Sequence, residues 1–281
     1  MRLHLALVLL AITVGCKPTA EEEGPTADQA FVTAAADQDT PGAAPTLTLL
    51  PELARGVAAL PRLTGDTEAI RAINADLERM DAQVRKAIPE CFAEGVQHPD
   101  WTRIVDAPST GPRFFSLTIL DDLYCGGNHP NNARLSVTYD LSTGRRVNWS
   151  DLLPVAFVGP LDETTSVFDF DFTVSRSPTL FGWLRGKIPV QTEEDRSWFE
   201  DCAPLYQGGV GGSSLMISID AEHEGLAIET VSLPHAARAC GSNEVMPIAE
   251  LQRIGAAPML IEAIRTAHRD GSWRKNLGSG T

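Results

Sequence analysis

Positive charge is scarce in this sequence. Lysine and arginine together number 23, against 37 aspartate and glutamate residues, and the formal net charge is -14. Such a chain repels nucleic acid and anionic lipid, so neither is an expected partner, and it attracts basic proteins by electrostatic steering. The same acidity is common in exported proteins, where it serves solubility alone.

Signature motifs of common enzymes are also absent. The six histidines form no H-x-x-x-H pair, so neither a zincin nor a carbohydrate-deacetylase site is visible. No G-x-S-x-G elbow occurs, and residues 182–187 fall short of a P-loop in spacing. The acidic pair Glu193 and Glu194 could serve as glycosidase carboxylates, although spacing in sequence does not establish that geometry. The sequence therefore favours binding over catalysis, and we expect no cofactor and no bound metal.

Long apolar runs are missing beyond the N-terminus, so no transmembrane helix is expected there. Residues 3–12 form an apolar run, after the basic Arg2, that is too short for a permanent membrane span. The following Thr13-Val14-Gly15-Cys16 resembles a lipobox, the signal for diacylation of a cysteine and cleavage before it. We therefore expect a signal peptide over residues 1–15 and a lipid on Cys16, where two acyl chains give stable anchoring. An ordinary signal peptide with a chance cysteine, or a short membrane anchor, is the alternative.

Residues 16–46 are expected to be the lipidated cysteine and a disordered acidic linker. The stretch after Cys16 is rich in Ala, Thr, Pro and Glu, and it cannot bury enough apolar surface to offset its ordering entropy. Lys17 stands where an Asp would indicate retention in the inner membrane. We therefore expect the cell envelope, with the anchor in the outer membrane facing the periplasm and no other membrane contact.

Four further cysteines remain in the chain, Cys91, Cys125, Cys202 and Cys240. In an exported chain they suggest two disulfides, for which three pairings are possible. We predict Cys91–Cys125 and Cys202–Cys240, because each pair lies within one apparent half of the domain. Loop closure of this length stabilises a fold by about 4 kcal/mol per bridge. A zinc site is the alternative, although the sequence contains no C-x-x-C pair.

The folded domain is expected over residues 47–270, as two halves of about 47–155 and 156–270, with a flexible tail over 271–281. Its pattern mixes helices with strands and shows no strict βαβ alternation. We therefore predict the α+β class, with antiparallel sheets packed against amphipathic helices and stabilised by disulfides.

Hydrophobic periodicity places the elements of this domain. Apolar residues at three- and four-residue spacing predict a helix that begins at Asp66 or Thr67 and is stopped by Pro89. Alternation predicts strands over residues 115–125, 135–141, 145–149, 215–220 and 226–231. The remaining segments are interpreted as helix and loop (163–200), a flexible glycine loop (208–212) and a last amphipathic helix (249–268).

Three motifs of the first half resemble a known family. They are Tyr124-Cys125-Gly126-Gly127-Asn128-His129-Pro130-Asn131, then Tyr139-Asp140-Leu141-Ser142-Thr143-Gly144, then Trp149-Ser150-Asp151-Leu152-Leu153. In this order they are similar to motifs of the extracytoplasmic domain of RsiV-type anti-sigma factors, a domain also attached to certain peptidoglycan deacetylases. With weaker similarity at both flanks, the resemblance covers about residues 60–255.

The resemblance implies work in the cell envelope, at or near peptidoglycan. Family members fused to anti-sigma factors bind lysozyme, so the expected partner is lysozyme, another basic cell-wall protein, or peptidoglycan itself. The sequence shows neither a cytoplasmic anti-sigma segment nor a deacetylase domain, so signalling by regulated proteolysis is not expected. A peptidoglycan-modifying enzyme and a structural envelope lipoprotein are the alternatives.

The candidate binding residues are Tyr124, Gly126, Gly127, Asn128 and His129. The paired glycines permit a turn at positive φ, and the proline that follows His129 fixes its exit. His129 could contact a ligand, and hydrogen bonding to the loop backbone is the alternative.

Two further groups of residues leave the choice between function and structure open. Asp121 and Asp122 could bind a cation or form a solvated strand end. Trp101, Trp149 or Trp183 could anchor a partner from an exposed patch, or each could belong to the core.

Overall fold

The apolar stripe of the first half forms one long helix, α1 (Glu68–Cys91), in the computed structural model. Thr67 caps this helix by accepting a hydrogen bond from the backbone N–H of Ile70. The prediction that Pro89 stops the helix is wrong, because Pro89 lies inside its last turn. A proline so close to the end removes one backbone hydrogen bond without ending the helix.

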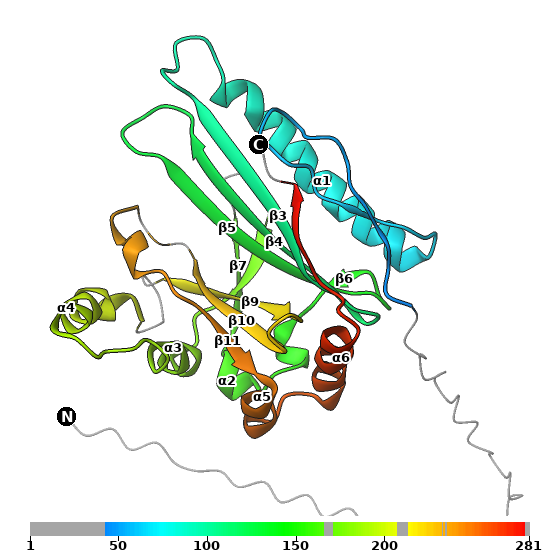
Figure 1. Cartoon of the computed structure of the whole chain (residues 1–281), viewed down its shortest axis with the longest axis vertical. Coiled ribbons are helices and arrows are strands. Elements are labelled where there is room, and N and C mark those ends of the chain that lie inside the picture. The colour runs from blue at the N-terminus through cyan, green and yellow to red at the C-terminus, as the bar shows by residue number, and fades with distance from the viewer. Residues whose placement is uncertain (1–42, 166–170, 207–212, 232, 234, 279–281) are drawn as a thin grey trace, which may run out of the picture. The chain divides into compact units, whose positions relative to one another are not determined.

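The structure describes residues 43–165, 171–206, 213–231, 233 and 235–278 (Figure 1). Cys16, most of the predicted linker over residues 16–46, and the predicted glycine loop over 208–212 lie outside these ranges. No helix within the described part combines the length and apolarity that a bilayer crossing demands.

Two five-stranded antiparallel sheets form the frame of the domain. The first has the order β12-β3-β4-β5-β6, with bounds β3 (Asp100–Thr110), β4 (Phe114–Tyr124), β5 (Asn131–Asp140), β6 (Arg145–Arg146) and β12 (Arg274–Gly278). The second has the order β11-β10-β9-β8-β7, with bounds β7 (Leu161–Thr165), β8 (Asp171–Ser175), β9 (Ser214–Asp220), β10 (Gly225–Val231) and β11 (Asn243–Pro247). A short pair, β1 (Leu47–Thr48) and β2 (Arg62–Leu63), precedes α1. The predicted α+β class with antiparallel sheets is confirmed.

The first sheet packs against α1 on one face and against the second sheet on the other (Figure 1). On the α1 side, Ile73, Leu77 and Val84 are fully buried with the apolar residues of β3 and β4. On the other side the first sheet presents small hydroxyl groups, and the Met216 sulfur on β9 accepts the Ser136 backbone N–H at 3.1 Å. The Ser116 and Thr138 hydroxyls lie 2.8 Å apart, and the Ile219 backbone N–H on β9 donates to the Ser116 oxygen at 3.4 Å.

Apolar side chains of several short helices pack with the second sheet in a separate core cluster. These helices are α2 (Val155–Val158), α3 (Pro178–Arg185), α5 (Ile248–Ile254) and α6 (Pro258–Arg269). Among their fully buried members are Phe181, Leu251 and Ile264. The domain therefore has two cores that each draw on both halves of the chain: the first includes Met216 and Val231, and the second includes Phe114 and Trp149.

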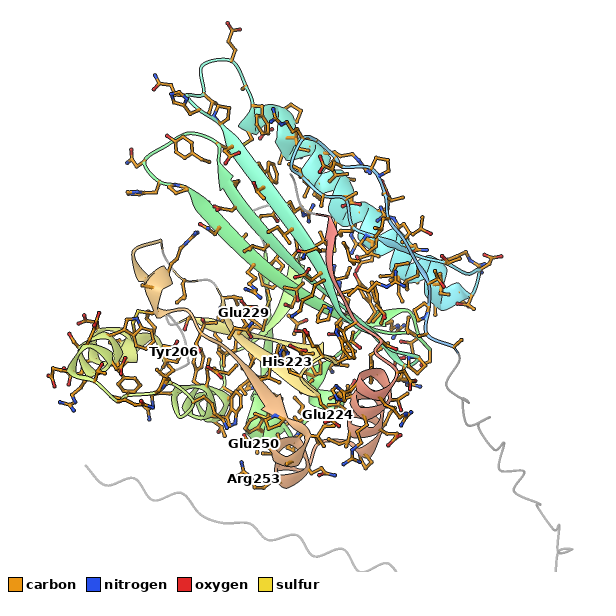
Figure 2. All side chains as sticks on the ribbon, viewed as in Figure 1. Tyr206, His223, Glu224, Glu229, Glu250 and Arg253 are labelled. Carbon is orange, nitrogen blue, oxygen red and sulfur yellow. A yellow bond between two sulfur atoms is a disulfide. The ribbon has the colours of Figure 1, made fainter. Side chains whose placement is uncertain are left out.

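An ion pair crosses that contact between the sheets. The Glu229 carboxylate on β10 lies 2.7 Å from the Arg134 guanidinium on β5, and Glu229 is buried (Figure 2). Burial raises the pKa of Glu229 to about 7, although the charge and hydrogen bond of Arg134 oppose the rise. The charged form of Glu229 is therefore disfavoured in the folded state.

Stability should consequently depend on pH through Glu229. Its pKa is higher in the folded state than in the unfolded chain, so its contribution is fully present below about pH 4.5 and is lost as the pH rises to about 7. The variant Glu229→Gln lacks this titrating group, so its unfolding free energy should rise relative to that of the parent protein by up to about 3 kcal/mol as the pH increases from 4.5 to 8. Urea unfolding at both pH values measures this gain, with the exposed Glu194→Gln as the matched control. An equal difference at both pH values would contradict the prediction.

The interpretation of residues 163–200 as helix and loop is incomplete. Helices α3 and α4 (Glu193–Cys202) are present in this segment. Its first part also contains two strands, because β7 overlaps its start and β8 lies within it, and the two strands pair antiparallel. The β7 sequence, Leu-Asp-Glu-Thr-Thr, carries no apolar alternation because it forms the edge of its sheet. Its pairing partner, rather than its own pattern, makes it a strand.

Three other predicted elements differ in extent. The strand predicted over 145–149 is only two residues long, because a 3-10 turn begins at Trp149. The single helix predicted over 249–268 is two helices, α5 and α6, separated by Gly255 at φ 86° and by Pro258 at the start of α6. The tail over 271–281 is not frayed throughout, since β12 pairs with β3 along the first sheet.

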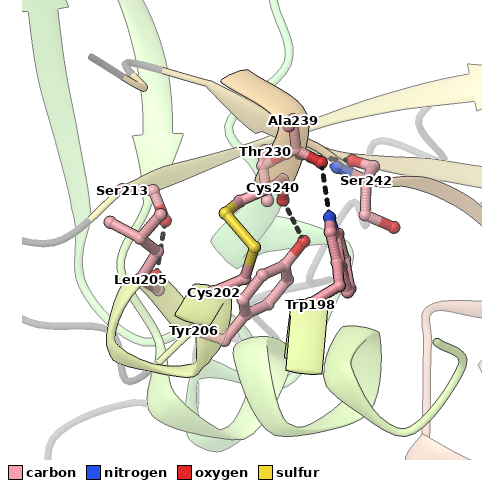
Figure 3. Close-up of a disulfide and its surroundings, with 9 residues drawn as sticks. All are labelled: Trp198, Cys202, Leu205, Tyr206, Ser213, Thr230, Ala239, Cys240 and Ser242. Atoms are coloured by element: carbon pink, nitrogen blue, oxygen red, sulfur yellow. Dashed lines mark hydrogen bonds between the residues drawn. A yellow bond between two sulfur atoms is a disulfide. The ribbon is translucent and has the colours of Figure 1, made fainter. Parts of the chain in front are cut away.

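Both predicted disulfides are confirmed, Cys91–Cys125 and Cys202–Cys240. The second joins the end of α4 to the 3-10 turn at His235–Cys240 (Figure 3). Around it, the Tyr206 hydroxyl donates to the Cys240 carbonyl at 2.5 Å and the Trp198 indole donates to the Ala239 carbonyl at 3.0 Å. The disulfide and these hydrogen bonds fix the outer helices of the second half to its sheet.

Candidate binding surface

The long strands of the first sheet end in an exposed surface that we call the tip. The tip consists of residues 92–99, which join α1 to β3, and residues 125–130, which join β4 to β5. It lies at the end of the strands that extends away from the second sheet (Figure 1). The Cys91–Cys125 disulfide joins the starting points of the two loops, so both are held at their base.

The predicted binding residues all lie in or beside the second loop of the tip. Gly126 and Gly127 have φ of 90° and 95°, which confirms the predicted positive-φ turn. The Tyr124 hydroxyl donates to the Gly127 carbonyl at 3.0 Å and closes the loop on itself. Asn128 and His129 are exposed at its end. The structure therefore brings these five residues together in a closed, outward-facing loop.

The two loops of the tip contact each other. A Cβ atom placed on Gly126 would lie 3.5 Å from the Val96 side chain in the first loop. His98, in that same first loop, adopts a positive φ of 51°, which is uncommon for a residue other than glycine. The contact and the disulfide restrict both loops, which lowers the entropy that a partner would have to remove on binding.

The tip is acidic. Residues 90–102 and 121–132 contain neither lysine nor arginine, and Glu90, Glu94, Asp100 and Asp122 are exposed there. Positive charge meets this surface at its base, where the Arg238 guanidinium donates to the side chain of Asn131 at 2.8 Å. The exposed end of the sheet is therefore a predominantly acidic surface, suited to a basic partner.

A hollow of about 650 Å³ lies beside the tip. Its wall is mostly apolar and includes Ile88, Phe92 and Trp101, with the charged Arg55 and Asp100 also on its lining. Phe92 is 42% exposed, which is unusual for a side chain of this size. The hollow offers an apolar contact within an acidic surface.

Tryptophans do not provide exposed anchors in the described structure, contrary to one possibility left open by the sequence. Trp101 and Trp149 are buried. Trp183 is half-buried and donates its indole N–H to Glu250. An exposed aromatic side chain of the tip is Phe92, which the sequence analysis missed. Its signal in the sequence is an aromatic residue directly after the last helical turn, between Glu90 and Glu94.

A buried cluster of charges lies beneath the tip, between α1 and the first sheet. The Arg103 guanidinium is completely buried and lies 3.8 Å from Asp81 and 3.5 Å from Asp121. Within the described residues its nitrogens make no hydrogen bond. Burial raises the pKa of both carboxyls, and the charge of Arg103 opposes the rise. The buried charges of the cluster attract one another and hold α1 against β3 and β4.

Asp121 and Asp122 do not form a cation site. Asp121 is buried and accepts a hydrogen bond from the Trp101 indole at 2.8 Å, whereas Asp122 is exposed. The two side chains point to opposite faces of β4, as neighbours on a strand do. Another acidic group, Asp220, Glu222 and His223, has ligand atoms within 4.8 Å of one another at the β9–β10 turn (Figure 2). Glu222 there is already paired with Lys275.

Comparison with models of known protein families and with curated proteins finds no match for this chain. The resemblance to the RsiV-type domain therefore stays a prediction that rests on the three motifs of the first half.

Proposed function

We propose that this chain is a lipid-anchored protein of the bacterial envelope whose tip binds a basic, cell-wall-associated protein such as lysozyme. One observation carries the proposal: the two restrained loops of the tip and the helix and strand ends beside them, which lack lysine and arginine over residues 90–102 and 121–132, present four exposed carboxylates next to a partly apolar hollow. Two disulfides support a location outside the cytoplasm, where cysteines are readily oxidised. The RsiV-type motifs include the second loop of the tip.

A hydrolase finds less support in the geometry. Such an enzyme would place His129 in a deep cleft beside a carboxyl of perturbed pKa. His129 is instead exposed at the tip. The carboxyls whose pKa burial raises are covered, Asp81 and Asp121 by α1 and the first sheet and Glu229 between the two sheets. The binding function is therefore the one that this surface supports best.

The first test is calorimetric titration of the full chain, in detergent and with both disulfides intact, against lysozyme at low and moderate salt. We expect saturable binding that weakens as salt rises, because exposed charges are screened. Absence of binding at either salt concentration would refute lysozyme as the partner.

Neutralising the tip should weaken this binding. The triple variant Glu90→Gln, Glu94→Gln, Asp122→Asn should lower the affinity for lysozyme by about 10-fold at low salt and reduce its salt dependence. The control variant Asp66→Asn, Glu194→Gln, Glu200→Gln changes the net charge equally at exposed positions outside the tip. Equal losses in the two variants would show that overall charge, and not the tip, drives association.

A further inference from the structure

A second cavity lies where elements of the two halves meet. It has a volume of about 670 Å³, and its lining comes from α1, from β6 and the residues after it, and from the β7–β8 pair. The lining includes Arg79 and Gln83 of α1, Arg146 of β6 with the following Asn148, Asp162 of β7 and Phe172 of β8. Its size is that of sites for small organic ligands, which commonly lie between packed units of a fold.

One wall of this cavity carries two arginines fixed by a shared carboxylate. The Asp76 carboxylate accepts hydrogen bonds from Arg146 Nε at 2.7 Å and from the Tyr139 hydroxyl at 2.8 Å, and it pairs with Arg79 through its other oxygen. Burial alone would raise the pKa of Asp76, but Arg146, Tyr139 and Arg79 together hold it below its usual value. Asp76 therefore stays ionised and orients both guanidinium groups, leaving the wall with one excess positive charge.

Arg146 is further fixed from the opposite side of the cavity. Its Nη1 donates to the Asp171 backbone carbonyl on β8, and its side chain is 26% exposed. Arg79 is the more accessible of the two, with 65% of its side chain exposed. A guanidinium presents several N–H donors in one plane, a geometry that matches a carboxylate. The pair therefore forms a prepared site for an anionic group.

The facing wall has the opposite character. Two acidic residues line it, Asp162, which lies 3.2 Å from Arg176, and the exposed Asp171. Phe172 adds an apolar ring, and Gln83 and Asn148 lie on the first side. A polyanion such as a phosphate ester would place excess negative charge near Asp162. A ligand with one carboxylate, N–H donors and a small apolar group fits both walls.

We propose that this cavity binds a short peptide with a free C-terminal carboxylate, which lies against Arg79 and Arg146. The site is separate from the tip and does not depend on the function proposed for it. A bacterial envelope holds two sources of this chemistry, the stem peptides of the cell wall and peptides from protein breakdown. The two kinds of peptide differ in the configuration of their terminal residues, D in the stem peptides and L in the peptides from protein breakdown, so dipeptides of each configuration distinguish them.

The test titrates the full chain, in detergent, with L-alanyl-L-alanine, with D-alanyl-D-alanine and with the C-terminal amide of each, by calorimetry. We expect saturable binding of at least one free acid and a loss of about 10-fold or more on amidation, because the charged hydrogen bonds are removed. The variant Arg79→Gln should bind the free acid more weakly by a similar factor, and it should bind the free acid and the amide with equal affinity. Arg71→Gln, an equally exposed change on the same helix, should alter neither.

Each outcome decides the proposal. Preference for the D,D acid assigns the site to cell-wall peptides, and preference for the L,L acid assigns it to peptides from protein breakdown. No saturable binding of any dipeptide up to about 10 mM overturns the proposal. Equal affinity for acid and amide, or an unchanged acid preference in Arg79→Gln, overturns it as well. Binding of a chitin oligosaccharide without dipeptide binding would show a sugar site instead. Lysozyme binding by Arg79→Gln should stay at the parent level in every case.

Discussion

Replacing Arg103 with methionine is expected to lower the free energy of unfolding by about 3–5 kcal/mol at pH 7. Methionine fills similar space but leaves the buried Asp121 without a cation, and Asp81 retains only Arg62, at 2.9 Å. Their pKa values, already raised by burial, should then rise further, so the loss should be largest at neutral pH and shrink toward pH 4. Denaturant unfolding of the full chain at pH 4 and pH 7 measures both effects.

The matched control for this experiment is Arg71→Met on the surface of α1. Arg71 pairs with Asp66, and 61% of its side chain is exposed, so this change should leave stability nearly unchanged. A double variant, Arg103→Met with Asp121→Asn, should recover part of the loss because it removes one buried charge. A loss below about 1 kcal/mol for Arg103→Met would contradict the interpretation of the cluster as a charge-paired support of the sheet.

Removing the Cys91–Cys125 disulfide should affect both stability and binding. The double variant Cys91→Ser, Cys125→Ser should lose about 2–4 kcal/mol of unfolding free energy, because the unfolded chain gains loop freedom. It should also bind lysozyme more weakly, since this disulfide holds the two loops of the tip together. Thermal unfolding and calorimetric titration, both below the melting temperature of the variant, measure the two effects.

The second disulfide provides the control. Cys202 and Cys240 are 38 residues apart, against 34 for the first pair, so loop closure predicts a similar loss of stability for Cys202→Ser, Cys240→Ser. This bridge lies in the second half of the chain and does not hold the loops of the tip, although Arg238 of the same 3-10 turn contacts Asn131 and Asn132 at the base of the tip. Its removal should therefore affect lysozyme affinity much less than removal of the first disulfide. Parallel weakening in both double variants would indicate that global stability, rather than the arrangement of the tip, governs binding.

Much of the fold follows from local patterns in the sequence. The apolar stripe through Ile73, Leu77 and Val84 predicts α1 because a helix places every third or fourth residue on one face. Alternation likewise predicts most of β4, β5, β9 and β10. The cysteine pairing was predictable because each pair lies within one half of the chain. The positive φ of Gly126 and Gly127 was predictable because glycine lacks a Cβ.

Other strands could not be found in this way. In β3 every second residue is buried, but one of these buried positions is the charged Arg103, between Trp101 and Val105. The charged residue interrupts the alternation of apolar and polar residues that would predict a strand. The charge is tolerated because Asp81 comes from a distant helix and Asp121 from the neighbouring strand. β12 shows no apolar alternation, because it is a polar edge strand whose partner, β3, lies far away in the sequence.

By itself the sequence determined the α+β class, the long helix, most of the central strands, both disulfides and the segment that forms the second loop of the tip. Tertiary structure alone decided that residues 92–99 complete the tip, that Phe92 within it is exposed, and that Arg79, Arg146 and Asp162 line one cavity. The physical reason is the range of the interactions. Helical stripes, strand alternation and glycine turns arise between near neighbours in the chain. Surfaces and cavities arise where distant segments pack, and no local pattern records those contacts.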